Sequence, residues 1–380
     1  MADSPRRKRP HILHAHSTFD LGGKEARAVR LMNHWDGRLE HTILSAQPDA
    51  MGARAQINPA VECHFPADAP SLQGWPAPGR YGRLARYMAR FDLVLTYNWG
   101  AMDAVMAHRI FSPLMRLPVL IHHEDGFNAD EADGLKLKRN YFRRIALGSA
   151  HALVVPSTRL HDIARDVWYQ RDAKVRLIPN GIDVTAYASP VAADAIPGLV
   201  RDPAKLLVGT LAGLRAVKNL PRLVRAIAPL KDRLQLVIVG EGPERDAIAQ
   251  EASAHGVDLH LAGFMGEPWR FVGAFDIFAL SSDSEQFPIS LVEAMAAGLP
   301  VVSTDVGDVR AMVAQENRAF VVPRDDESAL TQALLHLAEN AALRTALGAA
   351  NRQRAQADYA ESNMIKCYEN LYADALNMPF

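Results

Sequence analysis

Short runs rich in Val, Ile and Leu alternate with longer amphipathic stretches along most of this 380-residue chain. The short runs fit strands that are buried on both faces of a parallel sheet, and the amphipathic stretches fit helices that cover it. The alternation therefore predicts βαβ units and doubly wound α/β domains. At about 150 residues per domain, the length predicts two to three compact units.

The expected strands form two series. The first lies at residues 11–16, 41–46, 92–97, 118–122, 151–155 and 174–178, with helices expected at 24–35, 80–90 and 135–147. The second lies at residues 205–211, 234–239, 258–262, 277–280, 300–303 and 319–322, and a helix-rich tail follows from residue 327. Between the two series, an Ala- and Pro-rich stretch without clear periodicity predicts a linker.

The two series predict two domains. We expect an N-terminal Rossmann-like domain at residues 1–180, a linker at 181–203 and a C-terminal Rossmann-like domain at 204–357. The last helix, about residues 358–380, is expected to complete the N-terminal domain. Ligands of such domains bind outside the carboxyl ends of the strands, so the loops at those ends should carry the chemistry.

Composition excludes several classes of protein. With 49% hydrophobic and 22% charged residues, the chain is globular rather than disordered. Its longest stretch without Asp, Glu, Lys or Arg, residues 145–158, is shorter than the ~20 apolar residues of a membrane span. The basic N-terminus lacks the apolar segment of a secretory signal, and Cys63 and Cys367 match no metal spacing. We therefore expect a cytoplasmic protein with structural thiols.

Residues 281–302 hold the most informative pattern, in which a strand ends in a polar turn and a helix follows. The free amides at the helix start are those of Ile289, Ser290 and Leu291. Together with the helix dipole, these amides suit a diphosphate. Glu285 in the turn and Glu293 in the helix would then accept hydrogen bonds from sugar hydroxyls, Glu285 from the transferred sugar and Glu293 from the ribose. Alternatively, Glu285 caps the helix and Glu293 is solvated.

This segment resembles the retaining GT-B glycosyltransferases of the "glycosyl transferases group 1" type, also called family 4. In that family an E-x7-E signature precedes the A-M-A-x-G-x-P-V-V run that stands here at residues 294–302. The resemblance continues in I-P-N-G-I-D at 178–183, G-L-R-A-V-K-N at 213–219, V-G-E-G-P-E at 239–244 and L-A-G-F at 261–264. It covers the second domain almost entirely, whereas the first domain matches at scattered points.

The resemblance implies a fold and an activity. The fold is α/β of the GT-B type, with two Rossmann-like, doubly wound domains facing across a cleft. The activity is retaining transfer of a sugar from a nucleotide diphosphate sugar to a saccharide or lipid-linked saccharide, in bacterial surface or exopolysaccharide biosynthesis. Family frequency favours UDP over GDP. No metal or other cofactor is expected, because cationic side chains would stabilise the leaving diphosphate.

The resemblance also assigns residues of the second domain. Arg215 and Lys218 match positions that contact the donor diphosphate, whose charge two cations would neutralise. Otherwise they form surface salt bridges. Phe264 or Met265 would supply an apolar wall for the nucleotide base, or both belong to the core.

In the first domain, Gly22 and Gly23 follow the first expected strand and open a helix. Glycines let the backbone approach a phosphate or sugar closely, and this pair matches the family's glycine loop over the donor diphosphate and acceptor site. His122 ends a strand where many family members have a histidine that touches the donor sugar and its phosphate. Residues 122–125 also contain metal-ligand types, but successive residues of an extended chain point to opposite faces, so no metal site is expected.

The first half of the chain is net basic and the second half is net acidic, so the first half suits an anionic partner. Basic residues interleave with apolar ones in the expected helices 80–90 and 135–147. Such helices either contact an anionic membrane, at ~1 kcal/mol per basic side chain near it, or present a solvated basic face with the apolar residues in the core, which we favour. Nucleic acid is not an expected partner, because no recognised binding motif accompanies the charge.

Two departures from the family pattern and three rival functions remain open. Gln286 stands where the family usually has glycine, and Pro288 removes a backbone donor, so the donor sugar is expected to lie differently. A GT-B epimerase or hydrolase, or a non-catalytic nucleotide-sugar-binding protein, would share the fold. A nicotinamide-dependent oxidoreductase is least favoured, because no G-x-G-x-x-G follows the first strand of either domain.

Overall fold

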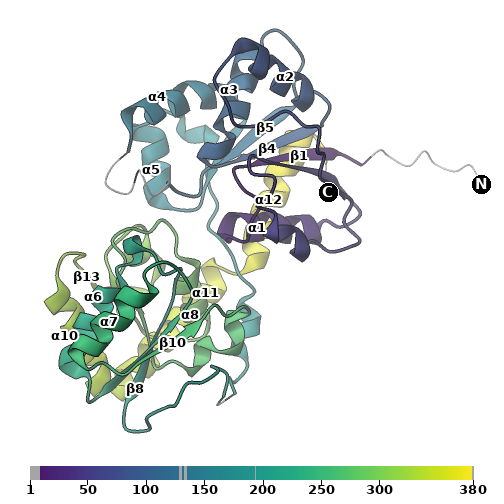
Figure 1. Ribbon diagram of the computed structural model, residues 1–380. Helices are drawn as coiled ribbons and strands as arrows, with labels where there is room; N and C mark the ends of the chain where they lie inside the picture. The colour runs from purple at the N-terminus through teal and green to yellow at the C-terminus, as the bar shows by residue number, and fades with distance from the viewer. Residues whose placement is uncertain (1–8, 128–130, 132–134, 193, 379–380) are drawn as a thin grey trace, which may run out of the picture. The chain divides into compact units, whose positions relative to one another are not determined.

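The computed structural model describes residues 9–127, 131, 135–192 and 194–378. The chain divides into two compact units: unit 1 comprises Met1–Pro179 and Ile365–Phe380, and unit 2 comprises Asn180–Met364. Each unit is built around one parallel sheet flanked by helices (Figure 1). The predicted class of two doubly wound α/β domains is confirmed.

Unit 1 holds a seven-stranded sheet in the order β3-β2-β1-β4-β5-β6-β7. Its strands are β1 (His11–His16), β2 (Glu40–Ser45), β3 (Cys63–His64), β4 (Leu93–Tyr97), β5 (Val119–His123), β6 (Ala152–Val155) and β7 (Val175–Leu177). The short β3 was not expected, because it contains no hydrophobic run of its own.

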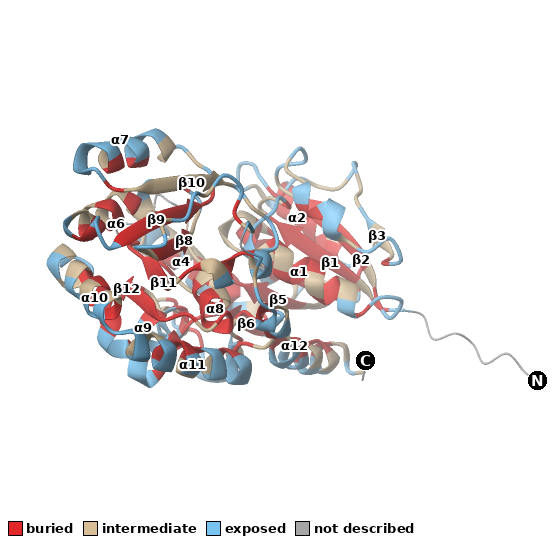
Figure 2. Cartoon of the chain, turned by 90° about the horizontal axis from the view of Figure 1, so that it is seen from below, coloured by how far each residue is buried: buried red, intermediate tan, exposed pale blue. Residues whose placement is uncertain are grey.

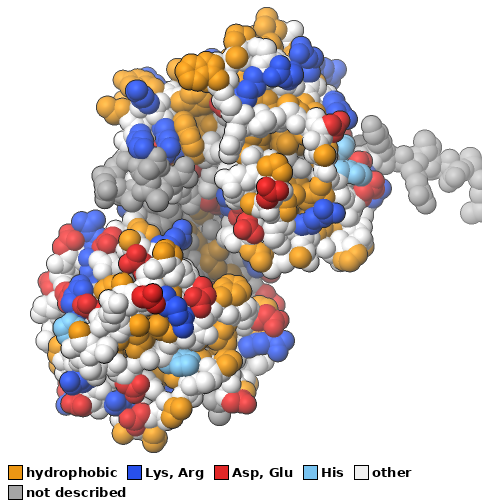
Figure 3. All heavy atoms as spheres, in the orientation of Figure 1, with side chains coloured by type: hydrophobic (Ala, Val, Ile, Leu, Met, Phe, Trp, Pro, Cys, Tyr) orange, Lys and Arg blue, Asp and Glu red, His pale blue; other side chains and the backbone are white. Residues whose placement is uncertain are grey.

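The helices of unit 1 are α1 (Gly23–His34), α2 (Pro78–Met88), α3 (Met102–Phe111), α4 (Leu137–Ala146), α5 (Thr158–Asp166) and most of α12 (Glu361–Leu376). Helix α3 packs between α2 and α4. Hydrophobic and basic side chains gather on the surface over these three helices (Figure 3). Helix α12 brings Tyr368 and Tyr372 against the ring of His123 in β5.

Unit 2 holds a six-stranded sheet in the order β10-β9-β8-β11-β12-β13. Its strands are β8 (Leu206–Leu211), β9 (Leu234–Val239), β10 (Leu259–Gly263), β11 (Ile277–Leu280), β12 (Val301–Thr304) and β13 (Val321–Val322). Its helices are α6 (Leu220–Ile227), α7 (Arg245–His255), α8 (Ile289–Ala296), α9 (Val309–Met312), α10 (Glu327–Glu339) and α11 (Ala341–Asp358). The stretch expected to be a linker packs onto this unit, with Ile182, Val184, Tyr187 and Ile196 buried in its core.

Most strands of both sheets are buried, whereas the outer faces of the helices are exposed (Figure 2). Because all strands of a sheet are parallel, their carboxyl ends share one edge. The strand order reverses between β1 and β4 in unit 1 and between β8 and β11 in unit 2, which are the places where such sheets bind ligands. Within the described residues, we find no helix with the length and apolar character of a membrane span.

Candidate active site

In unit 2, the loops after β8 and β11 meet around an ion pair. The Nζ of Lys218 lies 2.5 Å from Oε1 of Glu285, and the Ser282 hydroxyl donates to the same oxygen at 2.7 Å. The Glu285 side chain is buried. The fold thus brings together two predicted site residues that are far apart in the sequence.

A set of hydrogen bonds fixes the first loop to the second. Asn219, which has a left-handed backbone with φ 42°, donates from Nδ2 to the Asp283 carboxylate at 3.1 Å, and Arg222 pairs with Asp283 at 2.8 Å. The Asp283 amide donates to the carbonyl of Val217 at 2.8 Å, and the Ser281 hydroxyl donates to that of Asn219 at 2.9 Å. The roles of these residues were not predicted from the sequence, where the one available signal is the run of polar side chains after β11.

The loop that carries Arg215 is held by the G-E-G-P loop after β9. The Leu214 amide donates to the Glu241 carbonyl at 2.9 Å, and the Glu244 amide donates to the Leu214 carbonyl at 3.0 Å. Gly242 has φ 156°, and a Cβ there would lie 2.4 Å from the Leu214 carbonyl oxygen. Glycine is therefore required for this contact. Arg215 itself is exposed.

Helix α8 begins directly after Pro288, without a side-chain cap. The amides of Ile289 and Ser290 come first, where no carbonyl of the helix can accept from them. The expected availability of the Leu291 amide is wrong, because this group donates to the Pro288 carbonyl at 3.2 Å and closes the first turn. Glu293 lies in the second turn and is half-buried.

After β10, the two residues proposed for the base differ in their surroundings. Phe264 is 76% exposed, so it is available to an aromatic ring from outside. Met265 is half-buried and packs against the core of unit 2.

In unit 1, Gly22 and Gly23 form the exposed start of α1. Behind them Lys24 and Glu25 form a largely buried ion pair, and burial lowers the pKa of Lys24 to about 8. His16 ends β1, is fully buried and finds no hydrogen-bond partner for either ring nitrogen among the described residues. Burial, and then the charge of Lys24, keep the pKa of His16 well below its usual value.

His122 lies beneath the carboxyl edge of the sheet, fully buried. Its Nδ1 is 2.8 Å from the Thr96 hydroxyl, and its Nε2 is 3.8 Å from Glu124, which pairs with buried Arg143 of α4 at 3.1 Å. The neighbouring His123 faces the other side of the sheet, where its Nε2 lies 3.3 Å from the hydroxyl of α12 Tyr372. The contact of His122 with a donor sugar stays a prediction.

Asp125, in the loop after β5, is partly exposed. The Asp125 carboxylate accepts hydrogen bonds from both terminal nitrogens of Arg27 in α1, one of them at 2.8 Å. Its amide donates to the Asn98 side chain at 2.8 Å. Asn98 itself has φ 55° and ψ -174°, a strained conformation of the kind that concentrates at functional sites. This group could not be predicted from the sequence, because Arg27, Asn98 and Asp125 come from three separate segments.

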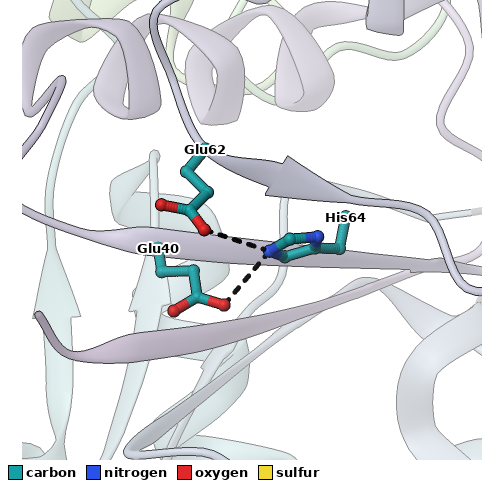
Figure 4. A group of neighbouring side chains, drawn as sticks. All are labelled: Glu40, Glu62 and His64. Atoms are coloured by element: carbon teal, nitrogen blue, oxygen red, sulfur yellow. Dashed lines mark hydrogen bonds and ion pairs between the residues drawn. The ribbon is translucent and has the colours of Figure 1, made fainter.

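Glu40, Glu62 and His64 form a separate group of possible metal ligands, whose ligand atoms lie within 4.8 Å of one another (Figure 4). The Nε2 of His64 lies 3.1 Å from Glu40 and 3.7 Å from Glu62, and Arg9 pairs with Glu62. Arg9 therefore offsets part of the negative charge of the two carboxylates. Glu40 begins β2, so this group does not belong to the carboxyl edge of the sheet.

Two family models match the chain. The model described as Glycosyltransferase Family 4 matches residues 21–186, and the model described as Glycosyl transferases group 1 matches residues 195–354. Between them they cover most of both units.

Individual proteins are also similar over most of their length. The chain is 29% identical over 325 residues to the putative glycosyltransferase EpsF of Bacillus subtilis, covering 77% of this chain and 79% of that protein. It is 27% identical over 313 residues to the N-acetylgalactosamine-N,N'-diacetylbacillosaminyl-diphospho-undecaprenol 4-alpha-N-acetylgalactosaminyltransferase of Campylobacter jejuni, covering 78% and 81%. Among solved structures, HepE from Anabaena in complex with UDP matches with a TM-score of 0.78 and 18% identity over 96% of this chain and 100% of that one, which shows a common fold.

Proposed function

This chain belongs to the glycosyltransferases of the group 1 and family 4 type, with the GT-B fold, and from that membership we propose the substrates and residues of its reaction. The enzyme uses a nucleotide sugar and belongs to a retaining family. We propose UDP as the nucleotide, and the UDP bound to HepE supports this. The proposed acceptor is a saccharide or lipid-linked saccharide in bacterial surface or exopolysaccharide synthesis. The diphospho-undecaprenol in the name of the Campylobacter relative supports that class.

The proposed donor site lies in unit 2, and the Lys218–Glu285 pair is the observation that carries it. The ammonium of Lys218 would leave Glu285 and donate charge-assisted hydrogen bonds to the diphosphate. Arg215 would be the second cation that contacts the diphosphate. Glu285 would then be free to accept from a hydroxyl of the transferred sugar. The leading amides of α8, Ile289 and Ser290, add dipolar stabilisation.

The remaining donor contacts follow from the same placement. We propose that Glu293 accepts from the ribose diol and that Phe264 stacks on the base, with Met265 behind it. The incoming acceptor hydroxyl attacks the anomeric carbon as the bond to the β-phosphate oxygen breaks, and its proton passes to that departing oxygen on the same face. No metal is required in this scheme, because the two cations and the helix amides stabilise the departing charge.

We propose that unit 1 binds the acceptor through the loops after β1 and β5, with the C-terminal helix as part of its core. Gly22 and Gly23 would allow close approach of donor phosphate or acceptor at the start of α1. His122 would touch the donor sugar or its phosphate at the same edge, and its Nε2, 3.8 Å from Glu124, would also hold the start of the loop after β5.

A transfer assay with a panel of UDP- and GDP-sugars tests the proposal. We expect one UDP-sugar to raise the melting temperature and to yield a glycosylated acceptor with retained configuration. Glu285→Gln should lower turnover by ~10²-fold, because an amide cannot replace the charged acceptor. Glu339→Gln, at an exposed ion pair of the same unit, serves as the control. Free sugar or an epimer as product would instead favour a hydrolase or epimerase, and donor binding without any product would favour a binding protein.

A further inference from the structure

Helix α4 presents an apolar ridge to solvent, formed by Leu137, Tyr141 and Ile145. These residues are four positions apart, so they lie along one face of the helix, and they are 75%, 64% and 57% exposed. The face toward the core carries Asn140, Arg143 and Ala146 instead. The expectation that the apolar residues of this helix lie in the core is therefore wrong for these three.

Arg143 fixes the rotation of α4 about its axis. It is fully buried, and it pairs with Glu124 at 3.1 Å and with Glu131 at 3.2 Å. Its guanidinium also lies about 5 Å from the rings of Trp99 and Trp168. Turning the ridge inward would leave buried carboxylates without their cation, which is strongly unfavourable. The exposure of the ridge is thus built into the fold.

Basic side chains flank the ridge. Helix α4 has no Asp or Glu, and its exposed basic residues are Lys138 and Arg144. Arg144 lies 4.0 Å above the ring of Tyr169, itself exposed. Arg83 and Arg86 of α2 are also exposed, and Figure 3 shows Lys and Arg side chains among hydrophobic ones on the surface of unit 1. Exposed apolar surface with such a rim marks an interaction site.

We propose that α4 anchors unit 1 to an anionic lipid bilayer, with the ridge inserted at the level of the headgroups and the flanking cations paired with lipid phosphates. Charge selects this occupant. A symmetric contact with a second copy would bring the same cations together, whereas an anionic surface complements them. The inference rests on the proposed function in one respect, because a lipid-linked acceptor would give the enzyme a reason to bind a membrane. The binding test below uses neither donor nor acceptor.

Co-sedimentation of the full chain with vesicles tests the proposal. We expect binding to vesicles that contain phosphatidylglycerol and little binding to pure phosphatidylcholine. Leu137→Ser with Ile145→Ser should weaken binding by at least ~10-fold at low and at high salt, because insertion does not depend on ionic strength. Lys138→Gln with Arg144→Gln should weaken it mainly at low salt. The control is Val200→Ser, which changes an apolar residue of unit 2 that is 84% exposed.

Three results would overturn the proposal. The first is unchanged vesicle binding by the ridge variant, Leu137→Ser with Ile145→Ser. The second is wild-type binding that high salt abolishes completely. The third is a wild type that does not bind vesicles, together with a changed oligomeric state in the ridge variant. The last result would assign the ridge to a second copy of the chain. Because the ridge is exposed, circular dichroism should show that the variants fold. Transfer to a water-soluble acceptor should persist in the ridge variant, so loss of vesicle binding and loss of the proposed activity are separate readouts.

Discussion

At the scale of single residues, the Lys218–Glu285 pair shows how a site can hold opposite charges until a ligand separates them. The two groups lie 2.5 Å apart, and the Lys218 side chain is largely buried. In the proposed reaction the ammonium serves the leaving diphosphate, where negative charge develops. A cation fixed at that point needs little reorganisation during the reaction.

We expect Lys218→Ala to lower turnover at saturating UDP-sugar by ~10²–10³-fold, the usual effect of removing one fixed donor to developing charge. Steady-state assays measure this loss, and the melting temperature reports whether the variant folds. Lys231→Ala, an exposed lysine of the same unit, is the matched control. Near-normal turnover in a folded Lys218→Ala protein would refute the assignment.

A second pair of single residues, Arg27 and Asp125, should contribute to the free energy of unfolding of unit 1. We expect Asp125→Ala to lower the stability of unit 1 by ~3–5 kcal/mol, because Arg27 would remain buried without its counter-charge. Denaturation with urea measures the change. The double variant with Arg27→Met should lose less than the sum of the two single variants. An additive result would show that the two groups do not depend on each other.

At the scale of elements, one loop positions another. The G-E-G-P loop holds the segment that carries Arg215 through backbone hydrogen bonds, and its Gly242 allows the close approach. The V-G-E-G-P-E motif thus acts structurally. It follows β9 and positions the neighbouring loop after β8, which carries the proposed diphosphate contacts.

We expect Gly242→Ala to raise the KM for the donor by ~10-fold or more, because a Cβ at φ 156° is strained and would displace the backbone of Leu214. Donor saturation curves measure this. Gly266→Ala is a suitable control, since a Cβ there meets no atom within 4 Å. An unchanged KM in the Gly242→Ala variant would show that the position of this loop does not matter for donor binding.

Much of the fold could be predicted from the sequence, because strands that are buried on both faces leave continuous apolar runs. β1 and β9 begin and end as expected. The rotation of α4 could not be predicted, since it depends on Arg143 finding Glu124 and Glu131, which lie in other segments. The same limit applies to the site. A local signature marks Glu285, whereas the group around Asp125 becomes visible only when three segments meet.

At the scale of the whole molecule, unit 1 differs from unit 2 in carrying buried histidines at its core. His14, His16 and His123 are fully buried, and burial keeps their pKa values well below 6.5. Burial, and then the charge of His11, lower the pKa of His41 to about 3. The folded unit therefore holds these rings neutral, whereas the unfolded chain protonates them near pH 6.5. Below that pH the unfolded state binds more protons, so stability falls with decreasing pH, by about 1.4 kcal/mol per pH unit for each ring.

We expect the urea concentration at which unit 1 is half unfolded to be lower at pH 5.5 than at pH 7.5. Tryptophan fluorescence can follow this transition, because unit 1 holds Trp35 and Trp168 in its core and unit 2 holds only the half-exposed Trp269. His16→Leu should make the pH dependence of the urea midpoint shallower, because the unfolded chain then binds one proton fewer. Equal midpoints at the two pH values would contradict the prediction.

The return of α12 to unit 1 has a consequence for biosynthesis. Unit 2 is one continuous stretch of chain, but unit 1 needs Tyr368 and Tyr372, which are translated after all of unit 2. Domains usually mature in the order in which they leave the ribosome. Unit 1 can complete its core only after α12 has been made, so we expect the face of its sheet that packs against Tyr368 and Tyr372 to stay uncovered until then. We therefore expect the demand for chaperones to concentrate on unit 1, whose two segments flank unit 2 in the sequence.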